Sequence, residues 1–190
     1  MRTAALSNYG LEARIDELKV KGGKVTHYPK GLAPYSDDVM AQYHNQQRIG
    51  HEDKPHALMT LYDVWVYQNP KLDEVPIISW VPLDHVSMPP GVAQWLVKDN
   101  VTPVAMSPHG QRQMEQAGFD SVYIPHMIDT NAYQPRDAFD TMPTREFMQV
   151  PEDAFLIGMV AANKANKILH RKAYAENLLA VALYMKENPN

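Results

Sequence analysis

The 190-residue sequence predicts an α/β fold built on an open parallel sheet, and three observations lead to this prediction. Short runs rich in apolar and β-branched residues recur along the chain and are bounded by turn residues. Segments with apolar residues at helical spacing lie between these runs. The apolar runs are nearly continuous, which is typical of parallel strands covered on both faces.

The expected strands follow the apolar runs in chain order. They cover residues 24–28, 56–62, 77–83, 103–107, 121–125 and 155–161, and residues 3–9 also have strand composition. The segment 13–28 fits two structures. Gly22-Gly23 at its centre favours a hairpin turn, although Ile15 and Leu18 would also suit a short helix.

Three helices are expected between these strands. Residues 37–47 have an acidic start and apolar residues at helical spacing. Residues 90–98 begin with proline, which is favoured at the first helical position. Ser107 can cap a third helix that starts at Pro108 and ends before Gly118.

The composition along the chain predicts two domains. Residues 1–130 form the first domain, and residues 131–153, rich in Pro, Asp, Thr and Asn, read as an interdomain linker with one short helix near 144–148. Residues 154–190 begin a second domain with the strand 155–161 and a helix from about 171 to 187.

One strand and one helix cannot cover both sheet faces or pair both strand edges. We therefore expect the chain to be a fragment that stops early in its second domain and that can self-associate through exposed sheet edges. The alternative is that this last unit packs on the first domain as a terminal decoration.

Composition excludes several function classes. The absence of cysteine excludes disulfides, thiolate zinc sites and a cysteine nucleophile. No two of the eight histidines are spaced i, i+4, so we expect no metal site. The formal charge of −4 gives no reason to expect nucleic-acid binding. No apolar run reaches the ~20 residues of a membrane span. The N-terminus also lacks the apolar region of a secretory signal, so we expect a cytoplasmic protein.

Two candidate catalytic groups follow expected strands. Asp84 and His85 come after the strand 77–83, and His126 comes after 121–125. In open parallel sheets, ligands bind outside the carboxyl ends of the strands. A carboxylate beside an imidazole could hold a sugar hydroxyl or move a proton there. The alternative is structural, with Asp84 capping a turn and His126 bonded to backbone.

A basic segment lies between the last expected strand and helix. It contains Asn163, Lys164, Arg171 and Lys172, which could hold a diphosphate together with the amides of a helix N-terminus. An exposed basic loop is the alternative. The chain has no glycine-rich phosphate loop and no G-x-G-x-x-G sequence, so kinase and dinucleotide interpretations lack support.

The order of these segments resembles a known family. Residues 80–85 with Pro89-Pro90, then 103–107, then 124–126 with Asp129-Thr130, and finally 158–164 with 171–173, are similar to the group 1 (family 4) glycosyltransferases of the GT-B fold. The resemblance runs over nearly the whole chain. It implies two Rossmann-like domains, an acceptor side formed by the N-terminal one and a nucleotide-sugar donor held mainly by the C-terminal one.

The resemblance also implies the chemistry. A hexosyl group would pass from a nucleoside-diphosphate sugar to the hydroxyl of an unknown acceptor with retention of configuration. Asp84, His85 and His126 would orient acceptor or sugar. Asn163, Lys164, Arg171 and Lys172 would bind the departing diphosphate without a metal or other cofactor.

The chain departs from the family pattern at both ends. The usual first strand–helix unit is absent, and the chain ends before the family's paired donor-site glutamates, so we expect no activity of this chain alone. A GT-B sugar-nucleotide epimerase and a non-catalytic sugar- or nucleotide-binding module remain open as alternatives.

Overall fold

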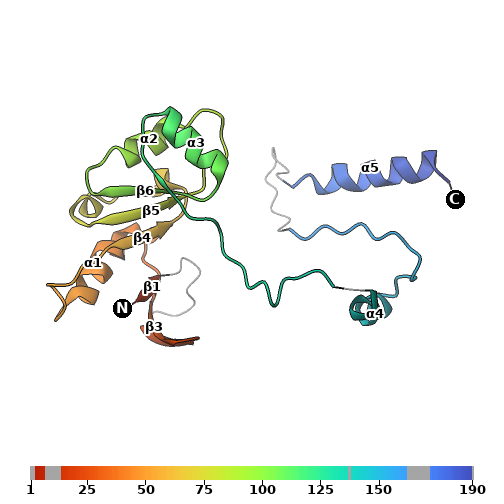
Figure 1. Cartoon of the computed structure of the whole chain (residues 1–190), viewed down its shortest axis with the longest axis horizontal. Coiled ribbons are helices and arrows are strands. Elements are labelled where there is room, and N and C mark those ends of the chain that lie inside the picture. The colour runs from red at the N-terminus through yellow and green to blue at the C-terminus, as the bar shows by residue number, and fades with distance from the viewer. Residues whose placement is uncertain (1–2, 7–13, 137, 162–171, 190) are drawn as a thin grey trace. The chain divides into compact units, whose positions relative to one another are not determined.

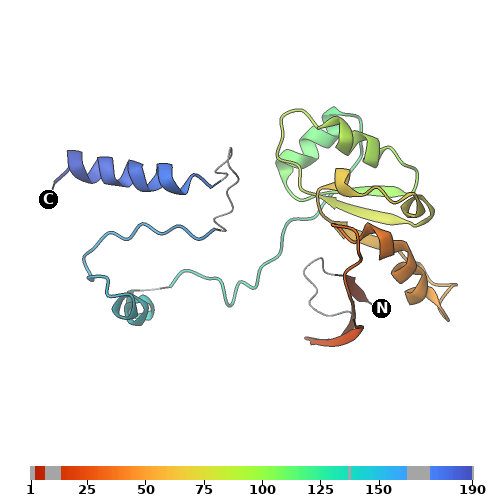
Figure 2. The same ribbon diagram turned by 180° about the vertical axis from the view of Figure 1, so that it is seen from behind.

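The computed structural model describes residues 3–6, 14–136, 138–161 and 172–189. The chain divides into two units, Met1–Ile128 and Asp129–Asn190 (Figures 1 and 2). The helices and strands of the first unit, with η denoting a 3-10 helix, are β1 (Ala4–Leu6), β2 (Asp16–Val20), β3 (Gly23–Tyr28), α1 (Asp37–Arg48), β4 (Leu58–Leu61), η1 (Val64–Val66), η2 (Pro70–Glu74), β5 (Ile77–Val81), α2 (Pro90–Leu96), β6 (Val101–Ala105), α3 (Pro108–Gln116) and β7 (Val122–Tyr123).

The first sheet has three strands in the order β1-β3-β2. β2 and β3 form the hairpin that the sequence favours, with Val20 opposite Gly23. Gly22 has φ +95°, a conformation that costs glycine little and other residues more. β1 pairs parallel with β3 from Ala4 opposite Thr26. The expectation of one parallel sheet over residues 1–130 is therefore wrong, because β1, β2 and β3 form a separate mixed sheet in which β3 pairs with both β1 and β2.

The second sheet has four strands in the order β4-β5-β6-β7, and all of them run parallel. This sheet confirms the α/β class and is consistent with a Rossmann-like arrangement. α2 and α3 connect consecutive strands and lie on the same side of β5 and β6 in both views (Figures 1 and 2). Proline starts both helices, and the Ser107 side chain caps α3.

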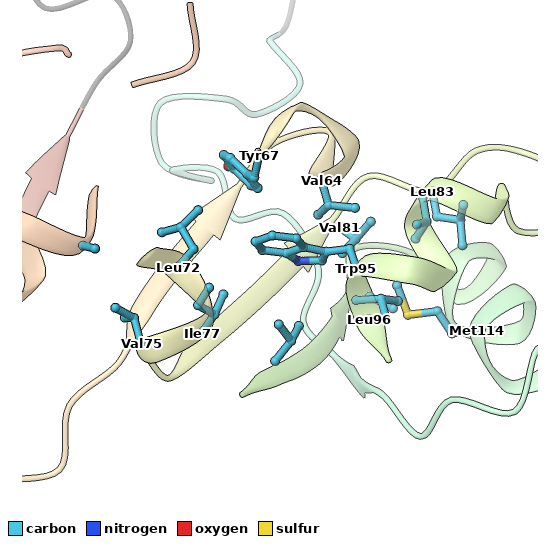
Figure 3. Packing of buried hydrophobic residues seen from close by; sticks show 14 residues of the cluster. Val64, Tyr67, Leu72, Val75, Ile77, Val81, Leu83, Trp95, Leu96 and Met114 are labelled. Carbon is cyan, nitrogen blue, oxygen red and sulfur yellow. The ribbon is translucent and has the colours of Figure 1, made fainter. Parts of the chain in front are cut away.

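The hydrophobic core lies between this sheet and the helices. Alternate residues of β5, namely Ile77 and Val81, meet Trp95 of α2 and Leu72 of η2 there (Figure 3). The face also carries buried polar groups: Trp95 Nε1 donates to Ser79 Oγ at 3.0 Å, and the hydroxyls of Ser79 and Thr60 are 3.2 Å apart. These bonds satisfy polar groups that would otherwise be costly to bury.

The opposite face of the parallel sheet is only partly covered. The register places Leu61, Trp80, Val104 and Val122 in one row across the four strands. Trp80 and Val104 are buried, whereas Leu61 and Val122 at the ends of the row are about half exposed. The expectation of a sheet covered on both faces is therefore wrong at the edge strands β4 and β7.

The second unit contains α4 (Ala138–Phe147) and α5 (Tyr174–Glu187). Arg145 Nη1 donates to the carbonyls of Pro151 and Ala154 at 2.9 and 3.1 Å, which folds the chain back after α4. The strand predicted for residues 155–161 is absent, and Phe155 is 92% exposed. No neighbouring strand is described in this unit, and an unpaired segment cannot form a ladder of hydrogen bonds. None of the residues of α5 is buried.

Candidate functional site

The carboxyl edge of the parallel sheet brings together several polar and aromatic side chains of the first unit. Because β4 to β7 run parallel, the segments that follow them leave the sheet at the same edge. Each of these segments carries a side chain that could touch a ligand. They are Trp65 after β4, Asp84 and His85 after β5, Ser107 and His109 after β6, and His126 after β7.

Asp84 and His85 are in direct contact, with Nδ1 of the imidazole 2.8 Å from Oδ1 of the carboxylate. This contact fixes which ring nitrogen faces the carboxylate and leaves Nε2 for another partner. The side chains are 57% exposed for His85 and 91% exposed for Asp84. The pair is therefore accessible to a ligand from solvent.

A second histidine, His109, joins this group through the backbone. Its Nε2 lies 3.1 Å from the carbonyl oxygen of His85. Ser107 Oγ accepts a hydrogen bond from the Gly110 amide at 2.9 Å, and this cap starts α3 and sets His109 in its first turn. A Cβ on Gly110 would lie 3.4 Å from the Leu83 carbonyl, so α3 starts close against the segment after β5. Sequence reasoning did not select His109, because its partner His85 lies 24 residues away in the chain.

His126 is held by Trp80 and not by the Asp84–His85 pair. Its ring centroid is 5.1 Å from that of Trp80. Trp80 Nε1 donates to the carbonyl of Ile124 at 2.8 Å and thereby fixes the segment after β7. β5 and β7 run in the same direction with β6 between them, so Asp84 and His126 both follow carboxyl ends of this sheet. Within the described part of the chain, His126 has no bond to Asp84 or His85.

A pocket of about 270 Å³ opens beside His85 and is lined by Trp65, His85, Pro89 and Gly91. Gly91 allows α2 to start close to η1, since a Cβ there would lie 3.4 Å from Trp65 Cβ. Sequence reasoning gave Trp65 no role. Its position shortly after an apolar strand was the signal that could have selected it.

The predicted phosphate-binding residues fall mostly outside the described residues, namely Asn163, Lys164 and Arg171. Lys172 is described, and it is exposed one residue before Ala173, the N-cap of α5. Its carbonyl oxygen accepts a 3.3 Å hydrogen bond from Asn177 Nδ2. The exposed side chain of Lys172 is therefore accessible to an anionic ligand.

Within the described residues, no three His, Asp or Glu side chains are grouped so that they could hold a metal ion. None of the described helices combines the length and the apolar character that crossing a bilayer demands. The chain matches no family model, no curated protein and no solved structure at a significant level. The geometry by itself defines an α/β unit whose parallel sheet presents three imidazoles, a carboxylate and an indole at its carboxyl edge.

Proposed function

We propose that this chain supplies the acceptor side of a glycosyltransferase of GT-B architecture, which transfers a hexosyl group from a nucleoside-diphosphate sugar to an acceptor hydroxyl with retention. The observation that carries the proposal is the Asp84–His85 pair, set after the carboxyl end of a parallel strand. The four-stranded parallel sheet and the order of the segments that resemble the group 1 (family 4) enzymes support it as well.

The Asp84–His85 pair suits hydroxyl chemistry. With Nδ1 of His85 facing Asp84 at 2.8 Å, Nε2 can accept a hydrogen bond or a proton from a sugar hydroxyl. His126 would contact the sugar from the segment after β7, where Trp80 positions it. The departing diphosphate would be bound by Asn163, Lys164, Arg171 and Lys172, because fixed cations stabilise developing negative charge without a metal.

A transfer assay tests this function. The chain, supplied with a donor domain of the GT-B fold, is incubated with UDP- and GDP-hexoses and a set of glycoside acceptors, and both glycoside product and released nucleotide are measured. The chain alone is expected to give no product. We expect activity to fall at least about tenfold in His85→Gln and Asp84→Asn, as for the loss of an acid–base group. His51→Gln is the matched control, because His51 is an exposed histidine in a turn after α1. Product formation that is equal in all variants would refute the assignment of the pair.

A second candidate is a sugar-binding module without catalysis. The exposure of Asp84 and His85 favours it, because catalysis of glycosyl transfer requires a site from which water is excluded. In that case the chain binds glycosides, and neither product nor released nucleotide accumulates with any donor. The same assay, run beside a binding titration, separates the two functions.

A further inference from the structure

We infer that the pocket lined by Trp65, His85, Pro89 and Gly91 binds one pyranose ring, that of the acceptor under the proposed function on which this inference rests. The pocket volume of about 270 Å³ lies just below the range in which drug-sized ligands are buried. It therefore fits one sugar ring better than an oligosaccharide or a nucleotide. The pocket is formed entirely by the first unit.

The three tryptophans of the chain differ in a way that indicates a ligand at Trp65. Trp80 and Trp95 are 8% and 5% exposed, and each donates its indole N–H to a protein oxygen, Ile124 O and Ser79 Oγ respectively. Trp65 is 43% exposed. Its indole N–H has no hydrogen-bond partner among the described residues. A large indole with an apolar ring and a free N–H is typical of a binding surface.

The chemistry of the lining matches a pyranose. Such a ring has an apolar C–H face and a rim of hydroxyls. The indole of Trp65 and the ring of Pro89 offer apolar surface, and His85 offers Nε2 to one hydroxyl, with its Nδ1 held by Asp84. Gly91 adds no side chain and leaves the space open. A sugar seated here would place a hydroxyl at the imidazole that the proposed transfer requires.

The test is direct binding of methyl pyranosides without any donor, followed by NMR. We expect the indole N–H resonance of Trp65 to shift with roughly millimolar affinity, while those of Trp80 and Trp95 stay in place. The acyclic polyol mannitol, which has no ring face, should leave all three resonances unchanged. A Trp65 resonance that no pyranoside moves, or that mannitol moves equally, would overturn the inference.

Variants locate the contact. By calorimetry, Trp65→Ala should weaken pyranoside binding at least about tenfold, Trp65→Phe less than about threefold, and His85→Gln by an intermediate factor. Phe147→Ala is the matched control, because it removes an exposed aromatic ring of the other unit and should change nothing. Equal binding by Trp65→Ala and wild type would refute the site even if Trp65→Phe behaved as expected.

The outcomes for the pocket and for the proposed function are distinguishable. Pyranoside binding at Trp65 without transfer from any nucleotide sugar, measured with the chain supplied with a donor domain, would support the pocket and remove the transferase. Transfer with an acceptor KM that Trp65→Ala leaves unchanged would support the transferase and overturn the pocket.

Discussion

Trp80 offers the sharpest test of how the sheet supports the site. Its indole is buried in the row that crosses β4 to β7, donates to Ile124 O at 2.8 Å and lies against the ring of His126. Trp80→Phe keeps an aromatic ring but removes the N–H donor and part of the buried surface. One lost hydrogen bond costs about 0.5–1.5 kcal/mol, and the smaller ring adds a cavity term. We expect Trp80→Phe to lower the free energy of unfolding by about 1–2 kcal/mol, and Trp80→Ala to lower it by about 3–5 kcal/mol.

Urea unfolding followed by tryptophan fluorescence measures this loss. All three tryptophans lie in the first unit, so the signal reports that unit alone. For a domain of this size the free energy of unfolding changes by about 1–3 kcal/mol per molar urea, and at about 2 kcal/mol per molar Trp80→Phe should lower the midpoint by about 0.5–1 M. Trp65→Phe is the matched control and should change the free energy of unfolding by less than about 0.5 kcal/mol, since Trp65 is partly exposed.

The same substitution should also reach the site. Without the bond from Trp80, the segment after β7 loses the contact that fixes Ile124, and the imidazole of His126 lies against a smaller ring. We expect the NMR resonances of His126 to shift, and those of His85 to stay, in Trp80→Phe. A variant with the midpoint of Trp65→Phe and an unchanged His126 spectrum would show that Trp80 neither stabilises β5 nor positions His126.

Three further predictions concern buried polar groups. Burial lowers the pKa of His44, the hydrogen bond with Asn45 opposes this, and the nearby charges of His56 and Arg48 lower the pKa slightly further. The free energy of unfolding should therefore be highest above pH about 6.5, the ordinary histidine pKa, and should fall as the pH falls below it. His44→Gln should reduce this dependence when urea unfolding is compared at pH about 7.5 and about 5. Burial also raises the pKa of the Tyr67 phenol, so stability should be complete below pH about 10 and decrease as the pH rises beyond it, whereas Tyr67→Phe should show a shallower alkaline loss. Asp37 Oδ2 accepts from the amides of Gln68 and Asn69 at 2.8 and 2.9 Å, so Asp37→Ala should cost about 2 kcal/mol or more in urea unfolding, and a loss below about 0.5 kcal/mol would contradict this role.

Local signals explain which elements the sequence predicted well. The turn at Gly22-Gly23 needs a backbone conformation that glycine adopts readily, so these two residues alone indicated the hairpin. The helix at Pro108 combines a capping serine with a proline at its first position, and its bounds agree with the expectation. In these cases the residues that form the structure are neighbours in the sequence.

The errors come from long-range pairing. Residues 155–161 have strand composition, yet a strand exists only beside a partner, and the described part of the second unit provides none. In the same way, composition identified residues 24–28 as a strand but could not show that its partners are β1 and β2 and that it stays apart from the parallel sheet. Pairing depends on segments far apart in the chain, so it has no local signature.

The candidate site combines both kinds of information. Asp84, His85 and His126 could be selected because each follows an apolar strand, and parallel strands end at one edge. The contact between His109 and the His85 carbonyl depends on how closely α3 starts against the segment after β5. The pocket at Trp65 depends on the approach of η1 to α2. Neither approach could be read from residue types alone.

The exposure of the Asp84–His85 pair separates binding from turnover. Binding of a pyranose needs only the indole of Trp65 and one hydrogen bond from His85, and both remain useful in contact with water. Proton transfer and stabilisation of a departing diphosphate need a low dielectric, which an exposed pair does not have. A transferase built on this edge must therefore cover His85 when its donor binds.

A ligand-dependent loss of solvent access at His85, measured by the rate of imidazole C2 hydrogen exchange, should accompany donor binding but not pyranoside binding alone. Equal protection by both ligands would show that the pocket closes by itself, and unchanged exchange with every nucleotide sugar would favour the binding module over the transferase.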